Sequence, residues 1–132
     1  MQEPKCNIDC DDGEIPANNA VKQWFTKMSR ASVLASRPIH LVPDIKRMFV
    51  EAGFVDVQEK VFKIPLNGWP RCPRMKRLGE MWRHNMCDGL AGFSYSLFHH
   101  YLDMPKEEIE VSLVQLAAGP VTDAEPRSRS SM

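Results

Sequence analysis

The sequence of 132 residues lacks the short motifs that hold nucleotides and phosphates or that carry common catalytic groups. It contains no Gly-x-Gly-x-x-Gly, no Walker loop, no Gly-x-Ser-x-Gly and no His-Glu-x-x-His. Its 7 glycines stand singly along the chain. Backbone N–H groups approach such ligands closely where glycines permit it, so these residues offer no recognisable loop for a nucleotide-like cofactor.

Long apolar runs and an excess of charge of either sign are also absent. The 17 Lys and Arg residues balance the 17 Asp and Glu residues, which argues against a nucleic-acid or membrane partner held by net charge. No apolar run approaches the roughly 18 residues that span a bilayer. The polar segment Met1–Asp12 has no apolar core of a signal peptide. We expect an intracellular protein, in the cytoplasm or, as the alternative, in the nucleus.

Metal-binding residues are few and poorly spaced. The four cysteines are Cys6, Cys10, Cys72 and Cys87. Cys6 and Cys10 could form half of a zinc site, but no second closely spaced pair of cysteines follows. In an intracellular chain all four cysteines are expected to remain thiols. Asp9, Asp11 and Asp12 do not have the spacing of a calcium loop. We therefore predict no metal site and interpret the carboxylates as a solvated turn.

The first half of the chain predicts two helices followed by a strand. Apolar residues at helical spacing indicate a helix over Ala20–Ala35, with Asn18 or Asn19 as its N-cap. A shorter helix is predicted next, with Pro43 in its first turn and Gly53 as the residue that ends it.

The segment Phe54–Ile64 is rich in Val and Phe with polar neighbours, which predicts a strand with a bend near Glu59. Helix, glycine and strand together are typical of an α/β unit. One strand cannot make a sheet, so the chain either pairs with another protein or is part of a larger α/β domain.

The second half predicts two further helices and a tail. A proline-rich loop, 65–73, precedes a long helical pattern that runs from Arg74 to Tyr101. Asp103 is predicted to cap a last helix. The polar segment 119–132 has almost nothing to bury and is predicted to be a disordered tail, which leaves 1–118 as the folded domain.

Three tryptophans and one histidine are the candidate site residues. Trp24, Trp69 and Trp82 could form the wall of a pocket for a flat organic substrate. His84 could act there as a general base. The alternatives are plain core packing for the tryptophans and a surface position for the histidine.

A basic stretch surrounds Trp82, and basic residues interleaved with an aromatic residue can mark contact with nucleic acid. Its members are Arg71, Arg74, Lys76, Arg77 and Arg83. Apolar residues of the predicted helix fall on a different face, so we interpret the basic residues as the solvated side of a buried helix. We expect no nucleic-acid partner.

Several short segments, in order from about residue 2 to residue 116, match one known family. They are Asp11-Asp12-Gly13, Arg37-Pro38, Glu51-Ala52-Gly53-Phe54-Val55-Asp56-Val57, Lys63-Ile64-Pro65, Asn67-Gly68-Trp69-Pro70, Leu78-Gly79, Gly89-Leu90-Ala91-Gly92-Phe93-Ser94 and Glu107-Glu108-Ile109-Glu110-Val111. With them the chain resembles the C-terminal half of the fungal class I S-adenosylmethionine (SAM)-dependent methyltransferases of secondary metabolism. This group includes, more distantly, the velvet-complex regulator methyltransferase.

The resemblance implies a partial, helix-rich Rossmann-like α/β fold with Phe54–Ile64 as a late strand. The helices around that strand would shape a substrate pocket. The family's SAM site lies on earlier strands that would precede Met1, so SAM is implied by the family alone and no cofactor-binding residue can be assigned to this chain. After residue 118 the family's final strand is replaced by the polar tail. The resemblance therefore implies a chain truncated at both ends.

Two main functions follow from the resemblance. The first is a methyltransferase-like protein that transfers a methyl group from SAM to a small secondary metabolite in a fungal biosynthetic pathway, with activity of the chain alone left open. The alternative is a non-catalytic remnant or partner-binding subunit, whose exposed edges are covered by another protein or by a second copy. A third interpretation is a binding or cyclase-like module that uses the aromatic pocket without SAM.

Overall fold

A computed structural model describes residues 1–10 and 13–118. Four helices form within these ranges: α1 (Ala20–Leu34), α2 (Val42–Glu51), α3 (Pro73–Leu102) and α4 (Lys106–Ala118). Asp11 and Asp12 of the predicted carboxylate turn lie outside the described residues, and so does the predicted tail, 119–132. None of the described helices combines the length and apolarity that a membrane crossing needs.

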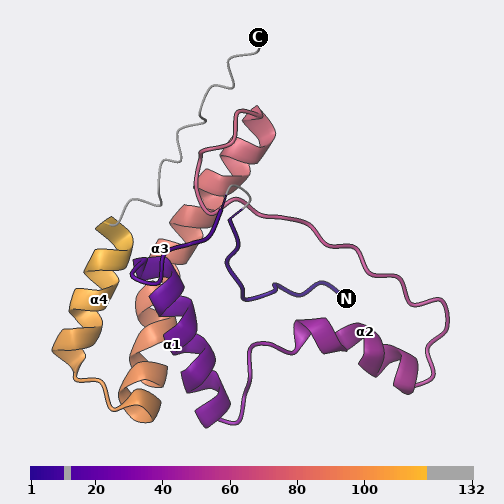
Figure 1. Cartoon of the computed structure of the whole chain (residues 1–132), viewed down its shortest axis with the longest axis horizontal. Helices are drawn as coiled ribbons and strands as arrows, with labels where there is room; N and C mark the ends of the chain where they lie inside the picture. Colours follow the sequence, from indigo (N-terminus) through magenta and orange to yellow (C-terminus); the bar gives the residue numbers. More distant parts are fainter. Residues whose placement is uncertain (11–12, 119–132) are drawn as a thin grey trace.

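Helices α1, α3 and α4 pack against one another in pairs and form a three-helix bundle (Figure 1). Seven buried apolar side chains make its core: Trp24, Met28, Ala31, Leu90, Phe98, Met104 and Ile109. They come from all three helices and from the turn between α3 and α4. Burial of such side chains contributes about 1.5–3 kcal/mol each relative to exposure, so the bundle holds most of the hydrophobic stabilisation of the described chain.

The predicted first helix is confirmed, and its N-cap is Asn19. The side-chain Oδ1 of Asn19 accepts hydrogen bonds from the backbone N–H groups of Val21 and Lys22, at 3.0 and 3.2 Å. These bonds satisfy two N–H groups that have no partner within the helix. After the helix, Ser36 has a left-handed backbone with φ 57°, which turns the chain away from the bundle.

The long third helix is also confirmed, but Asp103 has a different role from the predicted one. Asp103 has φ 52° and is the C-cap of α3, whereas α4 begins at Lys106 after Pro105. A left-handed residue reverses the chain after α3, and an aspartate tolerates that conformation better than most residues. The two helices can therefore pack antiparallel within the bundle.

Helix α3 has 30 residues, whereas α1 has 15 and α4 has 13. At 1.5 Å per residue, α3 is about twice as long as either neighbour. Its N-terminal half projects beyond the bundle, and the loop before it folds back along it (Figure 1). At Gly79, which is buried, the loop approaches so closely that a Cβ would lie 1.8 Å from the carbonyl oxygen of Asn67.

The predicted strand over Phe54–Ile64 is wrong, because these residues form no ladder and the segment bends at Asp56, which has φ 54°. A strand gains its stability from pairing with another strand, and the described part of the chain offers none. The apolar residues of the segment remain exposed: Val55 has 85% and Phe62 has 79% of its surface open. The predicted α/β, Rossmann-like fold class is therefore also wrong for the described residues. Their regular secondary structure consists of helices alone.

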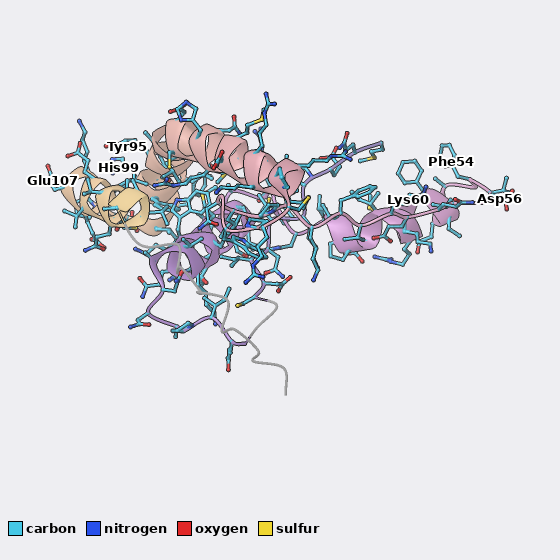
Figure 2. All side chains as sticks on the ribbon, turned by 90° about the horizontal axis from the view of Figure 1, so that it is seen from above. Phe54, Asp56, Lys60, Tyr95, His99 and Glu107 are labelled. Carbon is cyan, nitrogen blue, oxygen red and sulfur yellow. The ribbon has the colours of Figure 1, made fainter. Side chains whose placement is uncertain are left out.

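Helix α2 and the segment after it form a separate region, residues 41–64, which we call the arm. Helix α2 makes no helix–helix packing contact with the bundle, and none of its residues is buried. Figure 2 shows Phe54, Asp56 and Lys60 of the arm at the opposite end of the molecule from Tyr95, His99 and Glu107 of the bundle. The described chain thus consists of a packed bundle and an unpacked arm.

Candidate functional site

Trp24 lies inside the bundle and joins α1 to α3. It is 7% exposed, and its indole Nε1 donates a hydrogen bond of 2.8 Å to Oγ of Ser94, which is fully buried. The ring also makes an edge contact with Phe25, at a centroid distance of 5.1 Å. The polar group of a buried tryptophan needs such a partner. Trp24 therefore has a packing role, and only part of it reaches a surface hollow.

That hollow lies between α1 and α4, above Phe98 of α3. Its lining residues are Ala20, Gln23, Trp24, Lys27, Phe98, Ser112 and Gln115. Its volume is about 20 Å³, which has room for roughly one water molecule. Amide, ammonium and hydroxyl groups meet there, so the hollow can hold a small polar group. Sites for drug-sized or cofactor-sized ligands are of the order of 300 Å³ or more, so it is not a substrate pocket in this conformation.

Trp69 lies on the loop that folds back onto α3. Its backbone N–H donates to Oδ1 of Asn67 at 3.1 Å, which forms a tight Asx turn. Its side chain is 60% exposed. The loop is held close to the helix at Gly79, so Trp69 is presented to solvent from a fixed turn.

Trp82 and His84 lie on the projecting half of α3. Trp82 is half-buried, whereas His84 has 83% of its side chain exposed and lies 3.5 Å from Oδ2 of Asp88. Neither residue lines the hollow that Trp24 reaches. Within the described ranges no aromatic contact joins the three tryptophans. The structure therefore does not bring the four predicted residues into one pocket, and their joint role stays a prediction.

The basic stretch also lies on the projecting half of α3 and on the loop before it. All five of its members are exposed: Arg71, Arg74, Lys76, Arg77 and Arg83. The prediction that these basic residues are solvated is confirmed, whereas the apolar face of this half of the helix is only partly covered, since Met75 and Trp82 are half-buried. On this half of α3 Leu78 is 39% and Met81 is 61% exposed, so both apolar and basic residues face water.

Cys72 is the N-cap residue of α3 and has an altered acidity. The sulfur of Cys72 lies near the backbone N–H groups of Met75 and Arg74 and near the charge of Arg74. The geometry does not amount to a capping hydrogen bond. These N–H groups, followed by the Arg74 charge, lower the pKa of the thiol, as the start of a helix does for a thiolate. Cys6 behaves in the opposite way, because partial burial raises the pKa of its thiol.

The described residues do not fit SAM or a metal ion. A SAM site needs closely approaching backbone N–H groups and a cavity far larger than the hollow. Of the described glycines, only Gly13 and Gly53 have positive φ, and they are 40 positions apart in the sequence. No group of three His, Cys, Asp or Glu side chains in residues 1–10 and 13–118 could hold a metal.

Ser94 and Ser32 are buried polar residues that the sequence analysis did not single out. Ser94 accepts from Trp24, while Ser32 donates to the Ser29 carbonyl at 2.7 Å and accepts from the Ile39 N–H at 3.3 Å. Serine on the apolar side of a helical pattern is the only signal that could have identified them. Both have structural partners, so they serve packing and the turn after α1 instead of chemistry.

Comparison with known proteins gives three informative relatives, all fungal. The chain is 31% identical to the methyltransferase pytC of Aspergillus terreus over 101 residues, which are 76% of this chain and 31% of that protein. It is 30% identical to the secondary metabolism regulator LAE1 of Cochliobolus heterostrophus over 87 residues, 66% of this chain and 28% of the relative. It is 34% identical to the protein-methionine methyltransferase laeA of Chaetomium globosum over 71 residues, 53% of this chain and 22% of the relative.

The chain spans about a third or less of the length of these relatives. No family model matches it, and no solved structure is a significant match.

Proposed function

Because the chain belongs to the family of LaeA-like fungal methyltransferases, we propose that it takes part in SAM-dependent methyl transfer in secondary metabolism. The observation that carries the proposal is the 31% identity to a protein named as a methyltransferase over 76% of the chain. The chain would supply the substrate-side part of the enzyme. A second part, which resembles the rest of such a relative, would hold SAM.

The acceptor in this proposal is a small secondary metabolite. Trp69, Trp82 and His84 are open to solvent to different degrees on the loop and the projecting half of α3. They could line a pocket whose other wall belongs to the SAM-holding part, with Trp24 supporting α3 from the bundle through Ser94. In that pocket His84 would accept a proton from the acceptor atom, and the aromatic rings would hold a flat molecule.

Deletion of the gene in its host tests the function without any assumption about isolated domains. Mass spectrometry of the secreted metabolites should show loss of methylated products, with accumulation of their unmethylated precursors. Reintroduction of the unchanged gene should restore them, whereas His84→Gln should restore them only in part. An unchanged metabolite profile in the deletion strain would contradict a role in methyl transfer to small molecules.

Titration calorimetry with SAM tests where the cofactor is held. The purified chain alone should give no heat of binding at micromolar SAM, because its described residues form no SAM site. Micromolar binding to the chain alone would remove the need for a second part.

The second candidate is a non-catalytic subunit that binds a partner protein. The arm favours this candidate, because eight of its large apolar side chains are exposed. Monomeric proteins in water rarely expose a large apolar patch. The deletion strain separates the two functions when complemented with His84→Gln and Trp82→Ala. Full restoration of the methylated products by both variants would favour the non-catalytic subunit.

A further inference from the structure

The projecting half of α3 carries an excess of positive charge. Residues 71–83 hold five basic residues and one acidic residue, Glu80, in a chain whose positive and negative charges cancel. All five basic side chains are exposed. Apart from Gly79, the buried residues of α3 begin at Leu90, so the bundle does not cover this half of the helix. The local positive charge therefore faces solvent.

Two of the arginines share one side of the helix with two apolar residues. The spacing i, i+3, i+4 and i+7, which brings side chains onto a common side of an α-helix, is occupied by Arg74, Arg77, Leu78 and Met81. Leu78 is 39% and Met81 is 61% exposed. We call these four residues the basic–apolar stripe. At 1.5 Å per residue the stripe is about 10 Å long, or roughly two turns of helix.

The loop before α3 leaves the basic–apolar stripe uncovered. The loop meets the helix at Gly79, which lies roughly 150° around the helix from the centre of the stripe at about 3.6 residues per turn. Glu80 also reaches the loop, since a Cβ at Gly68 would lie 2.8 Å from its Oε1. The acidic residue of this region is therefore turned to the loop and does not neutralise the stripe.

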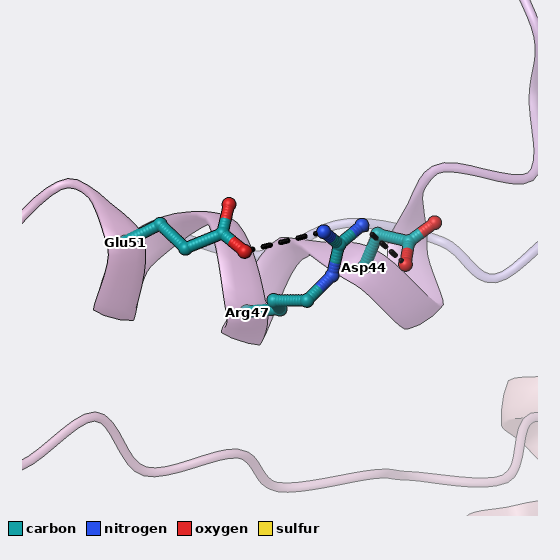
Figure 3. A network of polar contacts seen from close by, with 3 residues as sticks. All are labelled: Asp44, Arg47 and Glu51. Atoms are coloured by element: carbon teal, nitrogen blue, oxygen red, sulfur yellow. Dashed lines mark hydrogen bonds and ion pairs between the residues drawn. The ribbon is translucent and has the colours of Figure 1, made fainter.

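The two arginines of the stripe have no carboxylate partner within the part of the chain that the structure describes. Arg47 on α2 shows the paired state, because its guanidinium donates to Oδ1 of Asp44 at 3.1 Å and to Oε1 of Glu51 at 3.2 Å (Figure 3). An arginine whose guanidinium is open can bind a carboxylate through two parallel hydrogen bonds. Arg74 and Arg77 therefore retain this capacity for a group from outside.

The apolar half of the stripe decides the class of partner. Nucleic acids bind basic surfaces through their phosphates and stack their bases on exposed aromatic rings. The stripe has no aromatic residue, and Trp82 beside it is half-buried. Leu78 and Met81 would gain nothing from a phosphate backbone. A protein segment with carboxylates and apolar side chains on one face complements both halves of the stripe.

We propose that the basic–apolar stripe docks an acidic amphipathic segment of another protein. Carboxylates on successive turns of that segment pair with Arg74 and Arg77, and its apolar side chains cover Leu78 and Met81. The contact is small, which is typical of a weak and reversible interaction. The inference requires neither SAM nor a methyl acceptor, so it stands apart from the proposed function.

Fluorescence anisotropy with designed peptides tests the docking. A fluorescein-labelled peptide of about 12 residues carries glutamate and leucine at helical spacing, and two matched peptides replace either every glutamate with glutamine or every leucine with alanine. The full chain should bind the Glu/Leu peptide with micromolar affinity and each matched peptide about tenfold more weakly. Equal binding of the Glu/Ala peptide would mean that charge alone attracts it. That result, or no binding of the Glu/Leu peptide, would overturn the proposal.

A competitor in the same assay tests the class of partner. An oligothymidylate of about 20 nucleotides should displace the Glu/Leu peptide no better than the Glu/Ala peptide does. Stronger displacement by the oligonucleotide would mean that the stripe is a nucleic-acid surface, and the proposal would be wrong.

Two double variants with the same change of charge locate the contact. Arg74→Gln with Arg77→Gln removes both arginines of the stripe, whereas Lys76→Gln with Arg83→Gln removes two exposed charges from the other side of this half of α3. Both variants should keep the circular dichroism of the native chain, because the four side chains are exposed. The first should weaken binding of the Glu/Leu peptide about tenfold and the second less than about threefold. Equal effects would overturn the assignment of the stripe.

Met81→Gln tests the apolar half of the stripe at an exposed position. It should weaken binding of the Glu/Leu peptide severalfold and leave binding of the Glu/Ala peptide unchanged, because leucine is the side chain that Met81 contacts. The same change for both peptides, or no change for either, would contradict an apolar contact at the stripe.

The free chain provides a test against self-association. A second copy could supply an acidic segment from its first residues, which include Glu3, Asp9, Asp11, Asp12 and Glu14. Sedimentation equilibrium should show a monomer at the concentrations of the binding assay. A dimer that Arg74→Gln with Arg77→Gln dissociates would mean that a second copy occupies the stripe, and it would overturn the assignment to another protein.

Discussion

The bundle and the arm have similar shares of apolar residues, but only the bundle buries any of them. In the bundle, Phe98 and Ile109 have no exposed surface, whereas in the arm Phe62 and Val55 have 79% and 85%. The difference lies in partners: three helices contact one another, and α2 contacts none of them. Apolar composition therefore does not distinguish a buried core from an exposed segment in this protein; the packing does.

The largest expected effect compares the same substitution in both regions. Phe98→Ala should lower the free energy of unfolding by about 3–5 kcal/mol, because it removes a fully buried ring and leaves a cavity. Phe62→Ala should change it by less than about 0.5 kcal/mol, because the ring is already in water. Urea unfolding followed by circular dichroism measures both. A similar loss in the two variants would mean that the arm is packed in solution.

The next effect concerns the polar contact inside the bundle. Trp24→Phe should cost about 2–4 kcal/mol, since it shrinks a buried ring and leaves Oγ of Ser94 without its donor. Ser94→Ala should cost less, because it leaves only the indole N–H without a partner. If the hydrogen bond couples them, the double variant will lose less than the sum of the single losses. Strict additivity in urea unfolding would count against that bond.

A smaller effect is expected where the loop before α3 folds back onto this helix. Gly79→Ala should destabilise by about 1–3 kcal/mol, because its Cβ would overlap the Asn67 carbonyl and force the loop outward. Gly92→Ala, on the same helix, has no atom within 4 Å of the added Cβ and should stabilise by up to about 1 kcal/mol. Thermal unfolding gives the signs, and the tryptophan emission should shift only in Gly79→Ala, because Trp69 lies on the displaced loop. Opposite signs would confirm the close approach of the loop.

The smallest effect is a difference in thiol reactivity. The backbone N–H groups of Met75 and Arg74 lower the pKa of Cys72, so its alkylation by iodoacetamide should begin at lower pH in the native chain than in urea. Burial raises the pKa of Cys6, so its alkylation should begin at higher pH in the native chain than in urea. A depressed folded pKa stabilises the native state above the thiol's unfolded pKa, and that contribution is lost as the pH falls through the folded pKa. Mass spectrometry of the labelled peptides resolves both sites.

The sequence predicted the helices well because their signals are local. The apolar spacing from Ala20 and the cap at Asn19 fix α1, and Gly53 ends α2 with positive φ. The family resemblance was also correct, since the chain is 31% identical to pytC over 101 residues and 30% identical to LAE1 over 87 residues. Local chemistry at a helix end acts within a few residues, so one sequence is enough to find it.

The strand and the site could not be predicted in the same way. Alternating apolar residues in 54–64 indicate only that the segment would suit a ladder, and the ladder's partner is not among the described residues. The Trp24–Ser94 bond joins residues 70 positions apart, which no local pattern reveals. His84 and Trp24 also lie in different surroundings, one exposed beside Asp88 and one in the core.

The chain leaves α1 at Ser36, passes through the arm and returns to α3 through the loop that meets this helix at Gly79, so the bundle is assembled from pieces on both sides of the arm. Its three helices contact one another directly, and Trp24 binds Ser94 across that excursion. A peptide bond cut at the exposed Lys60 would therefore sever the backbone without separating the helices. We expect the two fragments to remain together as a nicked but folded body.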